Sequence, residues 1–69
     1  MSESEKSPLT ERQTEVLVLV AKGMRNKEIA RLLGTSENNI EYHSYRTLKR
    51  LGASNRTEAA VIAARAGWI

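Results

Sequence analysis

The chain has 69 residues, the size of one small domain, and at this length only roughly 60% of the unfolded surface can be buried on folding. It contains no cysteine, so disulfide bonds and thiolate metal sites are excluded, and stability must come from helix packing or from another chain. Eleven Lys and Arg against eight Asp and Glu give a formal charge of +3, which permits a polyanionic partner without requiring one.

No apolar run approaches the roughly 20 residues needed to cross a bilayer, and the start of the chain does not resemble a secretory signal. We therefore expect a soluble, cytoplasmic domain without a membrane partner. Residues 1–8 are polar, lack a periodic apolar pattern and end at Pro8. We interpret them as a flexible N-terminal lead-in and place one folded domain at residues 9–69.

The first predicted helix covers residues 10–22. Thr10 precedes Gln13 by three residues, which is the spacing of a capping box, and a run of apolar residues follows. Gly23 then supplies the left-handed residue that commonly ends a helix.

The middle of the chain predicts two helices separated by a tight turn. Asn26 is a suitable N-cap for a short helix over residues 26–33, and Ser36 is a suitable N-cap for a longer helix over residues 36–51. In the longer helix one stripe at helical spacing is expected to face the core: Ile40, Ser44, Thr47 or Leu48, and Leu51. A short helix, a turn and a longer helix are the outline of a helix-turn-helix motif, whose second helix enters the DNA major groove.

A fourth helix is predicted over residues 55–66. Asn55 and Glu58 repeat the capping-box spacing, and the helix is apolar nearly all round, so part of its surface is expected to meet another chain. Trp68 is expected to fold back onto the core. No alternating pattern argues for a strand, so the predicted fold class is all-α with four helices.

The helix junctions carry the strings Leu9-Thr10-x-Arg12-x-x-Glu15-Val16-Leu17, Gly23-x-x-Asn26-Lys27-Glu28-Ile29-Ala30, Ser36-x-x-x-Ile40-x-x-His43, Leu48-Lys49-Arg50-Leu51-Gly52, Arg56-Thr57-Glu58-Ala59 and Gly67-Trp68-Ile69. These strings resemble the LuxR/GerE-type DNA-binding domain of bacterial transcriptional regulators, and the resemblance covers residues 9–69. The resemblance implies that the second and third helices form the helix-turn-helix and that the fourth often makes a symmetric dimer.

The resemblance also suggests a role for individual residues. Phosphate contacts are expected from Lys27, Thr35, Ser36, Asn39, Arg46, Lys49 and Arg50. Base edges are expected to face Asn38, Glu41, Tyr42 and Tyr45. A dimer interface is expected at Val61, Ile62 and Arg65.

This chain departs from the family pattern on the predicted reading face. Glu41 stands where the family usually has Lys or Arg, and its carboxylate is repelled by phosphates but can accept a hydrogen bond from cytosine N4. Tyr42 and Tyr45 could pack on thymine methyl groups or could form a protein-binding patch. For the single histidine, His43, a structural role is favoured over a phosphate contact. Interhelical ion pairs are expected among Arg12, Glu15, Glu28 and Arg56.

The leading hypothesis is a bacterial transcriptional regulator, or the output domain of a larger one, that binds double-stranded DNA as a dimer and associates with the nucleoid when bound. RNA polymerase or another regulator are further partners to consider. No cofactor, metal or enzymatic activity is expected, since the chain lacks a Gly-rich phosphate loop, a histidine pair and a carboxylate pair in an evident cleft. The alternative is a protein-interaction module that binds another regulator through the Glu41/Tyr42/Tyr45 face. A third possibility, the promoter-reading helix-turn-helix of sigma factors, fits the end of the chain less well.

Overall fold

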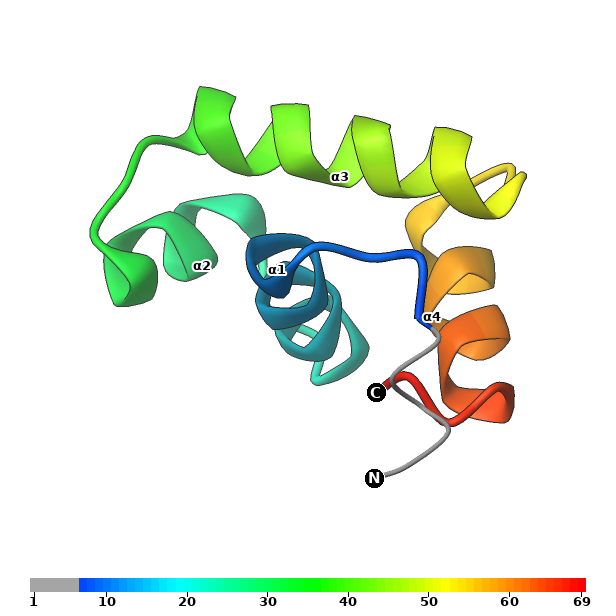
Figure 1. Ribbon diagram of the computed structural model, residues 1–69. Helices are drawn as coiled ribbons and strands as arrows, with labels where there is room; N and C mark the ends of the chain where they lie inside the picture. The colour runs from blue at the N-terminus through cyan, green and yellow to red at the C-terminus, as the bar shows by residue number, and fades with distance from the viewer. Residues whose placement is uncertain (1–6) are drawn as a thin grey trace.

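The computed structural model describes residues 7–69, and this part of the chain forms four helices and no strand (Figure 1). The helices are α1 (Glu11–Ala21), α2 (Asn26–Leu33), α3 (Glu37–Leu51) and α4 (Arg56–Arg65). The predicted all-α class is therefore confirmed, and every predicted helix boundary lies within one residue of the observed one. Most of the predicted lead-in lies outside the described residues.

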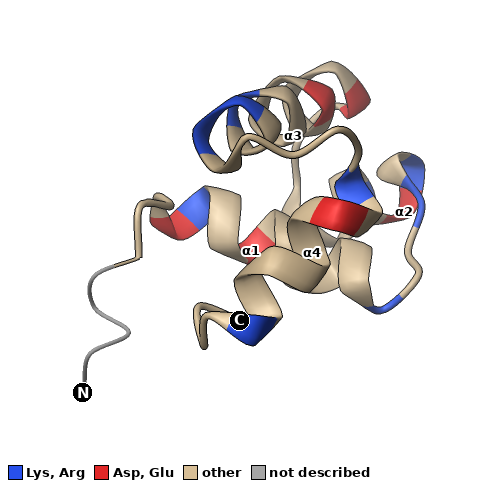
Figure 2. Cartoon of the chain, turned by 90° about the vertical axis from the view of Figure 1, so that its right-hand side faces the viewer, with Lys and Arg blue, Asp and Glu red and all other residues tan. Residues whose placement is uncertain are grey.

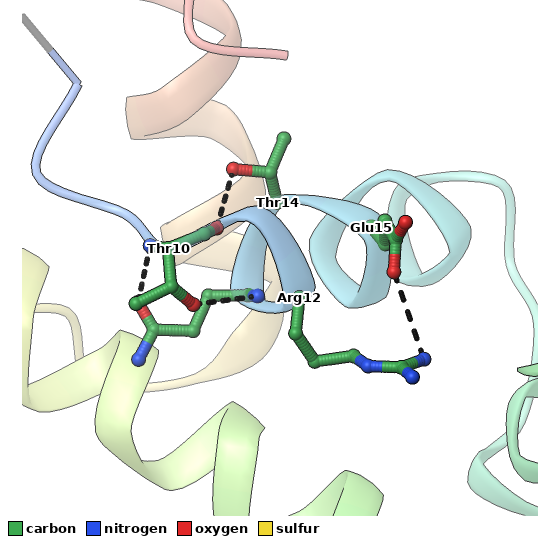
Figure 3. A network of polar contacts seen from close by, with 5 residues as sticks. Thr10, Arg12, Thr14 and Glu15 are labelled. Atoms are coloured by element: carbon green, nitrogen blue, oxygen red, sulfur yellow. Dashed lines mark hydrogen bonds and ion pairs between the residues drawn. The ribbon is translucent and has the colours of Figure 1, made fainter. Parts of the chain in front are cut away.

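The cap residues that the sequence indicates begin α1 and α3. At α1, the Thr10 hydroxyl accepts from the Gln13 backbone N–H at 3.1 Å, and the Gln13 side-chain oxygen accepts from the Thr10 N–H at 3.0 Å. The Thr14 hydroxyl also donates to the Thr10 carbonyl at 2.9 Å (Figure 3). At α3, the Ser36 hydroxyl accepts from the Asn39 N–H at 3.0 Å. Both helices thus start where a side chain satisfies a backbone donor that has no partner within the helix.

The start of α2 differs from the prediction, because Arg25 and not Asn26 is its N-cap. The Glu28 carboxylate accepts from the Arg25 backbone N–H at 2.9 Å, which is the half of a capping box that a residue at the third helical position supplies. Asn26 is the first helical residue, and its side-chain oxygen accepts from the guanidinium of Arg56 at the start of α4. Asn26 therefore joins two helices instead of capping one.

The predicted capping box of α4 is only half present. The Asn55 side-chain oxygen accepts from the Glu58 N–H at 2.8 Å, as expected. The Glu58 carboxylate, however, accepts from the Ser54 N–H at 2.6 Å, one residue before the cap. Glu58 thereby bonds both to Ser54 in the turn that leads into α4 and to the N-cap residue Asn55.

The core consists of two apolar clusters that meet on α1, which lies between the other helices in Figure 1. Val16 of α1 packs in the first cluster, and Leu17, the next residue, packs in the second. The buried members of the first cluster are Val16, Ile29, Ala30 and Ile40, and those of the second are Leu17, Ala59 and Ala63. Because it contributes to both clusters, α1 holds the helix-turn-helix and α4 in one structure.

Trp68 packs against the second cluster, as predicted, together with Ile69 and Leu9. Gly67 has a positive φ of 80°, and the Trp68 N–H donates to the Ala63 carbonyl at 2.8 Å. This turn reverses the chain after α4, so that both ends of the domain cover the same cluster.

The predicted core stripe of α3 is confirmed. Ile40, Ser44 and Thr47 are buried, while Leu48 and Leu51 are partly buried and pack against the second cluster. The Thr47 hydroxyl donates to the His43 carbonyl at 2.8 Å. α3 therefore contacts the first cluster through Ile40 and the second through its C-terminal half.

The prediction of interhelical ion pairs is wrong. Arg12 pairs with Glu15 within α1 at 3.6 Å, and both side chains are partly exposed (Figure 3). This is the one ion pair among residues 7–69. An exposed pair of this kind contributes about 0–1 kcal/mol. Arg12 and Glu15 are three residues apart on one helix, so each reaches the other more easily than a partner on another helix.

No helix within residues 7–69 combines the length and the apolar character that a membrane crossing requires.

We predict that Ile29→Ala lowers the free energy of unfolding by about 2–5 kcal/mol, because it empties a fully buried position in the first cluster. Urea denaturation followed by circular dichroism measures the change. Leu32→Ala is the matched control, since Leu32 lies on the same helix but is 61% exposed. Similar losses in the two variants would contradict the assignment of Ile29 to the core.

A second prediction concerns the cap of α3. Ser36→Ala should cost about 1 kcal/mol of stability, because the Asn39 N–H loses its acceptor. Ser36→Asp keeps an acceptor at the N-cap and should retain most of the stability. Thermal unfolding of the two variants beside the unmodified chain tests this, and an equal loss in both would show that the cap contributes little.

Candidate nucleic-acid interface

The exposed face of α3 carries the four residues predicted to meet base edges. Asn38, Glu41, Tyr42 and Tyr45 are all exposed, the two tyrosines to 53% and 57%. Their spacing of three and four residues places them on one side of the helix. The side that holds Ile40, Ser44 and Thr47 is buried. The structure thus brings the four together on the outward side of α3, which lies along the edge of the domain in Figure 1.

Charge is unevenly distributed along α3. Figure 2 shows acidic residues at one end of the helix and basic residues at the other. The acidic residues are Glu37 and Glu41, and the basic ones are Arg46, Lys49 and Arg50, all of them exposed. The carboxylates of Glu37 and Glu41 repel phosphates, whereas the three basic side chains attract them.

Each tyrosine on this face holds a basic side chain one turn further along. The Arg46 guanidinium donates to the Tyr42 hydroxyl at 2.9 Å, and its central carbon lies 5.6 Å from the centre of the Tyr42 ring. The Lys49 ammonium lies 5.6 Å from the centre of the Tyr45 ring. Exposed cation–π contacts of this kind are worth about 0.5–1 kcal/mol. These pairs were not predicted, although the four-residue spacing of Tyr and basic residues could have indicated them.

The predicted phosphate contacts near the turn lie at the start of α2 and α3. Lys27 is exposed in the first turn of α2. Ser36 is exposed at the N-cap of α3, with Thr35 and Asn39 half-buried beside it. The Ser36 hydroxyl accepts a backbone hydrogen bond but can still donate its own proton. The N-terminus of a helix also presents a partial positive charge, which suits an anion.

A polar groove of about 460 Å³ joins the starts of α2, α3 and α4. Its lining includes three basic side chains and one acidic one: Arg25, Lys27, Arg56 and Glu37. Arg25 and Arg56 were not predicted as part of the interface. Sequence spacing could not have indicated these two residues, because the groove forms only when the folded chain brings the start of α4 near the start of α2.

His43 is partly covered, and its role stays a prediction. Its ring is half-buried and meets the Tyr42 ring edge to face, with centres 5.4 Å apart and planes at 71°. Its carbonyl accepts the Thr47 hydroxyl. No group of three or more His, Cys, Asp or Glu side chains within residues 7–69 could hold a metal ion.

The predicted dimer residues on α4 differ in exposure. Val61 is 43% exposed and Arg65 is exposed, whereas Ile62 is half-buried. Val61 borders a mainly apolar groove of about 370 Å³ between the end of α1 and α4, which Val20, Ala21, Ala60 and Ala64 also line. The expectation of spare apolar surface on this helix is confirmed.

Two solved structures have the same fold. The transcription factor GerE superimposes with a TM-score of 0.86 and 32% sequence identity, covering 90% of this chain and 92% of that one. Escherichia coli SdiA gives a TM-score of 0.86 and 35% identity, covering 90% of this chain and 26% of that one.

Sequence relatives agree with this fold. The chain is 42% identical over 62 residues to the uncharacterized transcriptional regulatory protein YxjL of Bacillus subtilis, covering 90% of this chain and 28% of that protein. It is 38% identical over 60 residues to the nitrate/nitrite response regulator NarL of Escherichia coli, covering 87% of this chain and 28% of that protein. This chain therefore spans less than a third of the length of these two relatives.

Residues 7–63 match the family described as bacterial regulatory proteins, luxR family. With its four-helix structure and these relatives, the chain belongs to the luxR family of bacterial regulatory proteins.

Proposed function

We propose that this domain binds double-stranded DNA as part of a bacterial transcriptional regulator, with α3 in the major groove. The observation that carries the proposal is the exposed stripe Asn38, Glu41, Tyr42 and Tyr45 on a helix whose opposite face is buried. A major groove admits one helix, and a helix held in this way presents polar and aromatic side chains to base edges. The proposed place of action is the bacterial cytoplasm, on the nucleoid.

The proposed phosphate contacts lie on both sides of this stripe. Four of them contact one DNA strand near the turn, namely Lys27, Thr35, Ser36 and Asn39. The other three contact the DNA backbone beyond the end of the stripe, namely Arg46, Lys49 and Arg50. Arg46 and Lys49 are already oriented by Tyr42 and Tyr45. Because fewer rotamers are lost on binding, a side chain held in place costs less entropy when it meets a phosphate.

We further propose that two copies pair through α4, by way of Val61, Ile62 and Arg65. The exposed side of Val61 and the apolar groove beside it supply a surface that a second copy can cover. Two recognition helices in such a dimer reach half-sites about 34 Å apart, one turn of the duplex.

A second candidate function is a protein-interaction module that uses the Glu41/Tyr42/Tyr45 face. The exposure of two tyrosines favours it, because tyrosine is enriched at protein interfaces. RNA polymerase or another regulator is the kind of partner that this function implies.

We predict that DNA affinity falls steeply with salt, and that Lys27→Ala lowers the slope of log K against log salt by about 0.9, the value for one phosphate contact. Fluorescence anisotropy with labelled genomic fragments at several salt concentrations measures the slope. Lys22→Ala is the matched control, because it removes one exposed charge at the end of α1, outside the proposed interface.

Absence of binding at low salt, or binding indifferent to salt, would reject the DNA proposal. The Tyr42→Ala and Tyr45→Ala variants separate the two candidates. Loss of regulation in these variants with unchanged DNA affinity would support the protein-interaction function instead.

The proposed dimer gives a separate prediction. Val61→Asp should raise the dissociation constant of the dimer at least tenfold, about 1.4 kcal/mol, because a charge enters an apolar interface. Sedimentation velocity with and without DNA measures the association. Leu32→Asp places the same charge at an exposed apolar position on α2 and should not change it. A chain that stays monomeric on DNA would rule out pairing through α4.

A further inference from the structure

We infer that Glu41 selects the exocyclic amino group of a cytosine, and that binding is therefore weakened by methylation at cytosine N4 but not at cytosine C5. This inference rests on the proposed function, since it takes α3 to lie in the major groove. It adds the base that the helix selects and a chemical modification of DNA that controls the contact.

Glu41 is exposed and has no ionic partner among residues 7–69. The one ion pair among residues 7–69 is between Arg12 and Glu15. The basic groups further along α3 are directed elsewhere, because Arg46 contacts Tyr42 and Lys49 contacts Tyr45. The carboxylate of Glu41 therefore reaches the groove without a cation from α3 to neutralise it.

An unneutralised carboxylate restricts which base it can face. Ionised, it accepts hydrogen bonds and donates none, so it needs a donor on the base edge. In the major groove guanine offers two acceptors, and thymine offers an acceptor and a methyl group. Only cytosine and adenine present an amino donor there, at N4 and N6.

Cytosine is the better of these two bases for Glu41. Adenine places its N7 acceptor beside N6, so the second carboxylate oxygen faces a lone pair. Cytosine has no acceptor beside N4 on its groove edge, so one carboxylate oxygen can accept from N4 while the other stays in water. A Lys or Arg at this position would prefer guanine, whose groove edge carries two acceptors. Glu41 is therefore expected to prefer cytosine where those residues prefer guanine.

The amino group of cytosine carries two hydrogens, and this decides how methylation acts. One hydrogen pairs with guanine, and the other faces the major groove. A methyl group on N4 takes the place of the second hydrogen, so the base pair remains and the donor to Glu41 is lost. A methyl group on C5 leaves the donor in place and adds apolar surface, which the exposed rings of Tyr42 and Tyr45 can contact.

The experiment begins with selection of bound duplexes from a random library by the full chain, by Glu41→Gln and by Glu37→Gln. The unmodified chain should select cytosine at one position of each half-site, by about fivefold or more over the other bases. Glu41→Gln should change the preference at that position toward adenine, whose N6 and N7 suit an amide. Glu37→Gln removes one charge from the same helix, at a residue outside the proposed contacts, and should leave the preference unchanged.

The second step uses the selected duplex with N4-methylcytosine or C5-methylcytosine at that position. The unmodified chain should lose about fivefold or more in affinity on N4-methylation and little on C5-methylation. Glu41→Ala should respond equally to both duplexes. Binding by the unmodified chain with no cytosine preference, or with equal loss in Glu41→Ala on N4-methylation, overturns this inference alone. Failure to bind any duplex overturns the proposed function together with it.

Discussion

Burial of one narrow face of α3 is the constraint on which the rest of the domain depends. Ile40 has no exposed surface, and Ser44 and Thr47 are nearly as enclosed. Ile40 packs in the first cluster while Leu48 and Leu51 pack against the second, so the helix is held at two separated places. A helix held at two places has a fixed direction and a fixed rotation. The residues opposite the buried face are then presented to solvent with no further support.

The core that provides this support is small, so the turns and helix caps also determine where the helices end and how they are oriented. Gly34 has a positive φ of 71° at the end of α2, and the Thr35 N–H donates to the Ala30 carbonyl at 2.9 Å. This left-handed turn sets the angle at which α3 leaves α2. One polar group in the core lacks a hydrogen bond, because the buried hydroxyl of Ser44 has no partner within the described residues. Burying a hydroxyl without a partner costs free energy, which the surrounding apolar contacts offset.

The helices could be predicted from the sequence, because helix starts, helix ends and apolar periodicity depend on residues that lie close together in the chain. Contacts between distant residues were not predictable in this way. The N-cap of α2 was assigned to Asn26, but Asn26 bonds to Arg56, thirty residues later, and only the packing of α4 brings them together. The ion-pair prediction failed for the opposite reason, because Arg12 pairs with Glu15 on its own helix, a local contact that the three-residue spacing could have indicated. For the candidate interface, spacing correctly placed Asn38, Glu41, Tyr42 and Tyr45 on one exposed side, while their contacts with DNA stay a prediction.

The packing of Leu9, Trp68 and Ile69 against one cluster has a practical consequence for how the domain can be handled. The end of the described chain lies on the side of the domain away from α3 (Figure 1). A fluorophore, an affinity tag or a second folded unit joined after Ile69 therefore starts from the surface opposite the exposed stripe. Immobilising the protein through this position leaves that stripe facing solution.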